Sequence, residues 1–72
     1  MKEEEEIFQT VDEIFPELIE ILRQKYPELV KLYEQRYEYV KGPYNLATRL
    51  HNAYQILKAY LILKQVVKSL WS

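Results

Sequence analysis

Residues 15–25 read FPELIEILRQK and residues 26–36 read YPELVKLYEQR, so the chain repeats itself at an interval of eleven positions. Apolar and aromatic residues within and beyond the two copies follow one another at spacings of four, four and three. The average of about 3.67 residues is close to the period of a straight α-helix, and no alternation by two indicates a strand. The repeat therefore predicts helix over the first 41 residues. The residues in this spacing are Ile7, Val11, Phe15, Leu18, Leu22, Tyr26, Leu29, Tyr33, Tyr37 and Val40.

The two prolines of the repeat argue against one unbroken helix. A proline in a helix interior costs about 3 kcal/mol and disfavours helical angles in the residue before it. Pro-Glu-Leu is typical of a first helical turn instead. A continuous helix over 3–41 would also be about 58 Å long, more than the remaining chain could cover. We therefore expect a break at Pro16 and either a kink or a second break at Pro27.

Lys41-Gly42-Pro43 has the composition of a helix end, and Asn45 is a good N-cap for the next helix. At this stop signal Gly42 is expected to take a positive φ. The expected helices span about 3–14, 16–41 with a kink near Pro27, and 45–70. Together they predict a single all-α domain over 1–72, an antiparallel helical hairpin or three-helix bundle with a kinked or broken N-terminal half.

The C-terminal helix carries two apolar stripes, so it needs cover on more than one side. The first stripe, Leu46, Leu50, Ala53, Leu57 and Leu61, is expected to pack on the repeat, against Leu18, Leu22, Leu29 and Tyr33. The second is predicted to bind a partner or a second copy, with the alternative that the chain's own first helix covers it. The predicted partner-binding residues are Ile56, Leu63, Val66, Val67, Leu70 and Trp71.

The length and composition favour a protein that gains stability by association. A chain of 72 residues forms at most one domain and buries only about 60% of its unfolded surface. It has no cysteine, so disulfides cannot supplement that small core. The charge-rich, glycine-poor composition is typical of a thermophile and would also suit a designed helical protein. No secretory signal and no apolar run of about 20 residues is present, which predicts a cytoplasmic protein with no membrane partner.

Charge is distributed unevenly between the two halves. Residues 1–40 hold eleven acidic and five basic residues, a net charge of −6, whereas residues 41–72 hold five basic residues and no acidic one. The simpler interpretation is that the halves pack together and neutralise one another. The alternative is a basic surface that contacts nucleic acid or an acidic partner. Its candidate residues are Lys41, Arg49, His51, Asn52, Lys58, Lys64 and Lys68.

The sequence offers little for catalysis. Gly42 is the only glycine, which excludes phosphate-binding glycine loops, and His51 is the only histidine, which excludes paired-histidine metal motifs. We therefore expect no enzyme activity, cofactor, metal or small-molecule substrate. The predicted function is that of a small non-catalytic interaction protein, either a homo-oligomer or an accessory subunit of a larger assembly. The alternative is a nucleic-acid-binding accessory protein in replication or transcription.

Overall fold

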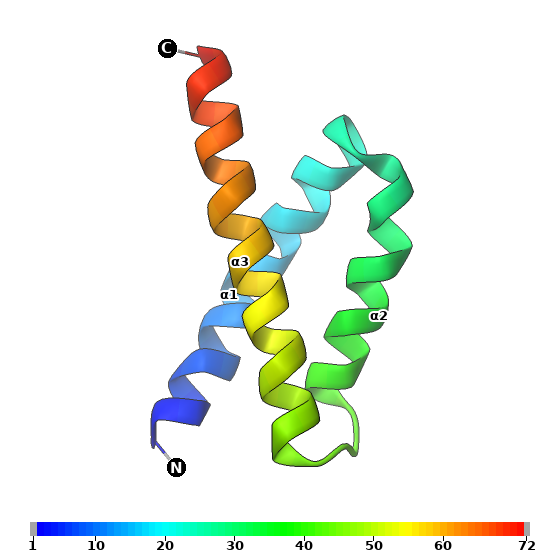
Figure 1. Cartoon of the computed structure of the whole chain (residues 1–72), viewed down its shortest axis with the longest axis vertical. Coiled ribbons are helices and arrows are strands. Elements are labelled where there is room, and N and C mark those ends of the chain that lie inside the picture. The colour runs from blue at the N-terminus through cyan, green and yellow to red at the C-terminus, as the bar shows by residue number, and fades with distance from the viewer. Residues whose placement is uncertain (1, 72) are drawn as a thin grey trace.

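The computed structural model describes residues 2–71, with the side chains of residues 2–69, and forms a three-helix bundle in this range. Figure 1 shows α1 and α3 running in the same direction, while α2 runs antiparallel to both. This arrangement confirms the predicted all-α class. The elements are α1 (Lys2–Lys25), the 3₁₀ turn η1 (Pro27–Leu29), α2 (Val30–Lys41) and α3 (Leu46–Trp71).

The expected break at Pro16 is wrong, because α1 continues through this proline. Buried aliphatic side chains lie on both sides of it, Val11 before it and Leu18, Ile19 and Leu22 after it. Full burial of one such side chain contributes about 1.5–3 kcal/mol, so the four together outweigh a cost of about 3 kcal/mol for the proline. Tertiary packing thus overrides the local preference at Pro16.

At Pro27 the helix is broken rather than kinked. Tyr26 leaves helical angles with φ −141° and ψ 64°, and its amide makes the last bond of α1 by donating to the carbonyl of Leu22 at 2.7 Å. Pro27 then opens η1, in the first-turn position that suits a residue without an N–H. The second copy of the repeat therefore forms η1 and the start of α2, which runs antiparallel to α1.

The connection between α2 and α3 lies where the stop signal places it, but Gly42 does not have the predicted positive φ. It is extended, with φ −83° and ψ −179°, and its amide donates to the carbonyl of Glu38 at 2.7 Å. The reason is Pro43, whose ring pushes the preceding residue into the extended region. Asn45 acts as the predicted N-cap, because its side-chain oxygen accepts the amide of Thr48 at 2.9 Å.

The core lies where the three helices meet, and α3 contributes residues of both predicted stripes to it. Ile56 and Leu63 of the second stripe are buried there with Ala53 of the first stripe, whereas Leu61 of the first stripe is 63% exposed. The first-stripe register is therefore wrong for Leu61, and also for the exposed Leu46. The buried cluster consists of Val11, Leu18, Ile19, Leu22, Val40, Ala53, Ile56 and Leu63.

The helix lengths leave part of α3 without cover from α2. The molecule is 39 Å long, which is about the length of a 26-residue helix such as α3. By the same rise per residue, the 12 residues of α2 reach only about 18 Å. In Figure 1 the last turns of α3 rise past the corner that joins α1 to α2. No helix in the described range 2–71 is long and apolar enough to cross a membrane.

Candidate interaction surface

The predicted partner-binding residues do not share one open face. Ile56 is 0% and Leu63 9% exposed, and both belong to the core of the chain itself. The chain's own helices cover these two residues, so the prediction that Ile56 and Leu63 bind a partner is wrong. Val67 is partly buried and Val66 is exposed. The side chains of Leu70 and Trp71 lie outside the described residues.

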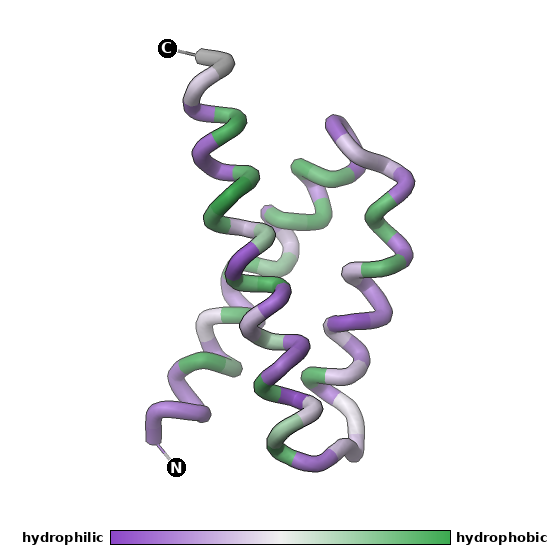
Figure 2. Tube along the Cα trace, in the orientation of Figure 1, coloured by the Kyte–Doolittle hydropathy of each residue, from purple (hydrophilic) through white to green (hydrophobic). Residues whose placement is uncertain are grey.

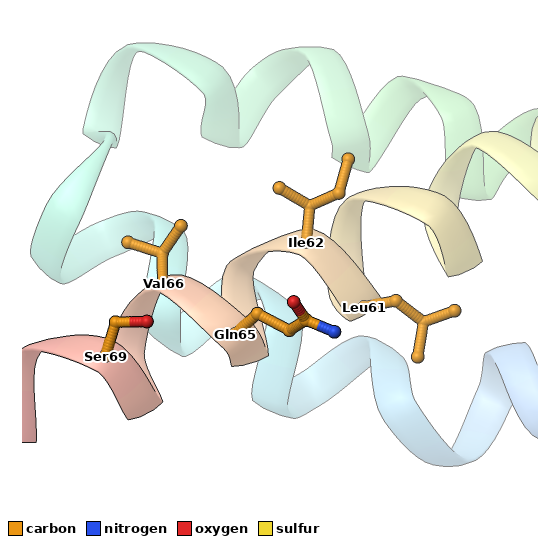
Figure 3. Close-up of a pocket in the computed structure, with 5 residues that line it drawn as sticks. All are labelled: Leu61, Ile62, Gln65, Val66 and Ser69. Carbon is orange, nitrogen blue, oxygen red and sulfur yellow. The ribbon is translucent and has the colours of Figure 1, made fainter. Parts of the chain in front are cut away.

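The aliphatic residues that face outward on the C-terminal half of α3 share only Val66 with the predicted partner-binding set. Leu61, Ile62 and Val66 are 63%, 54% and 38% exposed, and we call these three residues the outer patch. Figure 3 shows Ile62 and Val66 projecting on one side of the helix, one turn apart, with Leu61 and Gln65 beside them. Figure 2 shows short hydrophobic stretches separated by short hydrophilic ones along this part of α3. Ile62 belongs to neither predicted stripe, although its spacing of four from Val66 is a signal that could have identified it.

An apolar groove adjoins the outer patch. It lies between α3 and the corner formed by α1, η1 and α2, and its volume is about 270 Å³. Two outer-patch residues, Ile62 and Val66, also line the groove, so the two features form one continuous apolar surface. The groove is lined by Leu22, Tyr26, Leu29, Tyr33, Ala59, Ile62, Leu63 and Val66.

Two of the predicted nucleic-acid contacts are lysines that pair with acids of α1. The Lys41 ammonium lies 3.0 Å from a carboxylate oxygen of Asp12, and the Lys64 ammonium lies 2.9 Å from one of Glu17. These pairs join the acidic and the basic half of the chain, as the simpler interpretation of the charge distribution expects. Both lysines are therefore already neutralised within the molecule.

Each of these ion pairs also contains a tyrosine, four residues before the lysine. The Tyr37 hydroxyl donates to Asp12 at 2.7 Å, and the Tyr60 hydroxyl donates to Glu17 at 2.5 Å. We call Asp12 with Tyr37 and Lys41, and Glu17 with Tyr60 and Lys64, the two carboxylate clamps. The first joins α1 to α2, and the second joins α1 to α3.

The clamps shift the pKa values of their members. Burial raises the pKa of Asp12, but hydrogen bonds from Tyr37 and Lys41 outweigh it and hold the pKa below its usual 3.8. Hydrogen bonds from Tyr60 and Lys64 hold the pKa of Glu17 below its usual 4.5. Burial and the bond to Asp12 raise the pKa of Tyr37 to about 12. Both carboxylates are therefore ionised at neutral pH.

Two more predicted contacts act inside the fold. The Arg49 side chain donates from Nε to the carbonyl of Val40 at 2.8 Å, and its guanidinium lies 4.3 Å from the ring centre of Phe8. Asn52 is buried, accepts a hydrogen bond from Arg36 at 3.3 Å, and donates to the carbonyl of Thr48. Both residues are better placed to hold α3 against its neighbours than to contact a nucleic acid.

The remaining basic candidates, His51, Lys58 and Lys68, are exposed and form no hydrogen bond or ion pair within the described part of the chain. Lys58 lies one helical turn before the outer patch. Lys68 lines a shallow hollow together with Leu61 and Gln65, on the other side of the patch. Cations without internal partners thus border the outer patch.

Within the described residues, the outer patch and the groove together form a continuous apolar surface on α3. Among residues 2–69, no three His, Asp and Glu side chains gather as the ligands of a metal ion would. Comparison with models of known protein families, with curated proteins and with solved structures finds no match to this chain.

Proposed function

We propose that this chain is a small, non-catalytic helical interaction protein, either a homo-oligomer or an accessory subunit of a larger assembly. It binds another protein through the outer patch and the apolar groove. The observation that carries the proposal is the exposure of Leu61, Ile62 and Val66 on one helix beside a groove lined by apolar and aromatic side chains. Contiguous apolar surface of this kind marks interaction sites in proteins that fold in water.

The size of the chain gives a second reason for this function. A domain of about 70 residues gains little stability from its own core, and association is a common supplement. Part of α3 lies beyond the reach of α2, as the helix lengths require. A partner helix that covered the outer patch would remove apolar area from water at about 25 cal/mol per Å².

Nucleic-acid binding is the less supported alternative. Of its seven candidate residues, Lys41 and Lys64 pair with acids, while Arg49 and Asn52 bond within the fold. The exposed His51, Lys58 and Lys68 remain as its support. A phosphate contact of these cations would weaken steeply with added salt, whereas an apolar helix interface would not.

The proposal is tested by placing charge on the outer patch. We expect Leu61→Glu combined with Ile62→Glu to abolish binding, because burying a carboxylate without a partner is costly. The matched variant is Leu32→Glu, which changes a 42% exposed leucine on α2 outside the groove. Sedimentation velocity measures self-association, and capture from a lysate of the source cells with quantitative mass spectrometry measures partner binding. Circular dichroism checks that each variant is folded.

The expected result is an assembly formed by the wild type and by Leu32→Glu but not by the double variant. A wild-type chain that stays monomeric at high concentration and captures nothing would contradict the proposal. Capture that is equal for the wild type and the double variant would also contradict it. Salt-sensitive binding of DNA or RNA that all three proteins share would favour the alternative function.

A further inference from the structure

The outer patch has the shape that another helix can pack on. Ile62 and Val66 form one row along α3, and Leu61 and Gln65 form a second row beside it (Figure 3). The hollow between these rows is lined by Leu61, Ile62, Gln65, Val66 and Ser69. Rows of side chains four residues apart are the ridges and grooves through which helices pack, and a partner helix presents apolar anchors at the same spacing.

The charges around the patch specify what should border those anchors. Lys58 and Lys68 are exposed and unpaired within residues 2–69, in contrast to Lys41 and Lys64, which already contact acids of α1. Residues 42–72 contain no acidic residue, so α3 itself cannot neutralise these cations. Carboxylates on a partner would complement them and would disfavour a basic partner.

A second copy of this chain complements the patch poorly. If two α3 helices pair antiparallel with Leu61 opposite Ile62, Lys58 lies opposite Gln65 and Lys68 lies opposite Gln55, so neither lysine meets a carboxylate. Acids of the chain are concentrated on α1, but the described part of α1 exposes no large apolar side chain. On the acidic half, the exposed aliphatic residue is Leu32 alone among the described residues.

We propose that the occupant of the outer patch is an acidic amphipathic helix of another protein. Its apolar residues pack on Leu61, Ile62 and Val66, and its flanking carboxylates face Lys58 and Lys68. This inference rests on the proposed function, and it names the chemical class of the partner. Within that function it selects the accessory subunit over the homo-oligomer.

Two synthetic helical peptides provide the probe. They share one leucine stripe, and the residues that flank the stripe are glutamates in one peptide and lysines in the other. Titration of the full-length, ¹⁵N-labelled chain with each peptide is followed by NMR. We expect the glutamate peptide to bind about tenfold more tightly, because it forms two ion pairs where the lysine peptide meets two like charges. Amide shifts are expected within residues 58–69, and the preference should shrink as salt is added.

Charge reversal on α3 should reverse the preference. We expect Lys58→Glu with Lys68→Glu to bind the lysine peptide more tightly than the glutamate peptide. The matched variant is Lys31→Glu, which alters an exposed lysine on α2 and should leave the wild-type preference unchanged. Leu61→Glu with Ile62→Glu should abolish binding of both peptides.

Failure of this inference can be told from failure of the proposed function. If neither peptide binds, if both bind equally, or if the shifts lie away from residues 58–69, the acidic helix is excluded as the occupant. If sedimentation shows a dimer that Leu61→Glu and Ile62→Glu dissociate, or if the captured partner binds through a basic helix, the inference falls but the interaction function stands. A wild type that binds no protein at all removes both.

Discussion

Gly42 lies at the end of α2, in extended backbone that any residue can adopt. A Cβ at this position would lie 2.8 Å from the carbonyl oxygen of Glu38 and 2.8 Å from the ring of Tyr44. The Tyr44 ring packs edge-on against Tyr39, with ring centres 4.9 Å apart, which restricts its freedom to move away. Glycine is therefore required here by the close approach of neighbouring atoms and not by the sign of φ.

Gly42→Ala tests this account. The added methyl group must displace a backbone carbonyl or a packed ring, so we expect a loss of about 1–3 kcal/mol in the free energy of unfolding. Guanidinium denaturation measures the loss. Part of it should disappear when Tyr44→Ala is also present, because one of the two close contacts is then gone. An alanine variant as stable as the wild type would show that the close contacts relax at no cost.

Residues that act through neighbours in sequence could be predicted, and residues that act through distant partners could not. Asn45 was identifiable because its cap involves Thr48, only three positions away. Arg49 and Asn52 had the composition of a polar binding cluster. Their bonds to Val40 and Arg36 depend on how α2 and α3 pack, which the local sequence does not specify.

At the scale of elements, the two prolines show that tertiary packing decides whether a helix continues through a proline or ends before it. Pro16 and Pro27 occupy the same position in the repeat, yet α1 continues through the first and ends before the second. Phe15, just before Pro16, stacks on Tyr37 of α2 with ring centres 4.0 Å apart. This contact favours a continuous helix through Pro16. Tyr26, just before Pro27, is exposed, so the turn there costs little buried area.

The two carboxylate clamps join the helices into a bundle, and they should make its stability depend on pH. The folded-state pKa values of Asp12 and Glu17 lie below their usual 3.8 and 4.5, so the folded protein binds fewer protons than the unfolded chain in this range. The stabilisation is complete above the unfolded values and is lost as pH falls through the lowered folded values. We expect the melting temperature to fall as pH is lowered from about 5 to about 3.

Neutral variants separate the clamps from the other acids of the chain. Asp12→Asn with Glu17→Gln should lower the melting temperature at pH 7 and flatten its decline in acid. Glu13→Gln is the matched variant, since Glu13 is exposed on the same helix and joins α1 to no other helix by a hydrogen bond or ion pair. If the double variant declines in acid as steeply as the wild type, the clamps are not the source of the dependence.

At the scale of the whole molecule, the all-α class follows from the period of the repeat, but the orientation of α3 does not. Two apolar stripes are visible in its sequence, and either could face the core. The structure buries Ile56 and Leu63 of the second stripe together with Ala53 of the first, because α3 packs on both α1 and α2. Of the outer patch, the sequence predicts Val66 alone as a partner-binding residue, because whether Leu61 faces the core or the surface depends on the orientation of α3. Leu61 leaves the core when Leu63 enters it, since two residues along a helix are about 200° apart.

The orientation of α3 predicts opposite outcomes for two leucines that lie two positions apart. Leu63 is 9% exposed within the core, so Leu63→Ala should cost about 2–5 kcal/mol through lost burial and the cavity that remains. Leu61 is 63% exposed, so Leu61→Ala should change the free energy of unfolding by about 0.5 kcal/mol or less. Guanidinium denaturation of both variants, at a concentration where the wild type is monomeric, measures the difference. Equal losses would mean that Leu61 is buried in solution, as it would be if the whole first stripe faced the core. A large loss of stability at Leu63 alone also shows which leucine is suitable for a binding test. A charge at Leu63 would unfold the chain, whereas a charge at Leu61 changes only the surface of the folded protein.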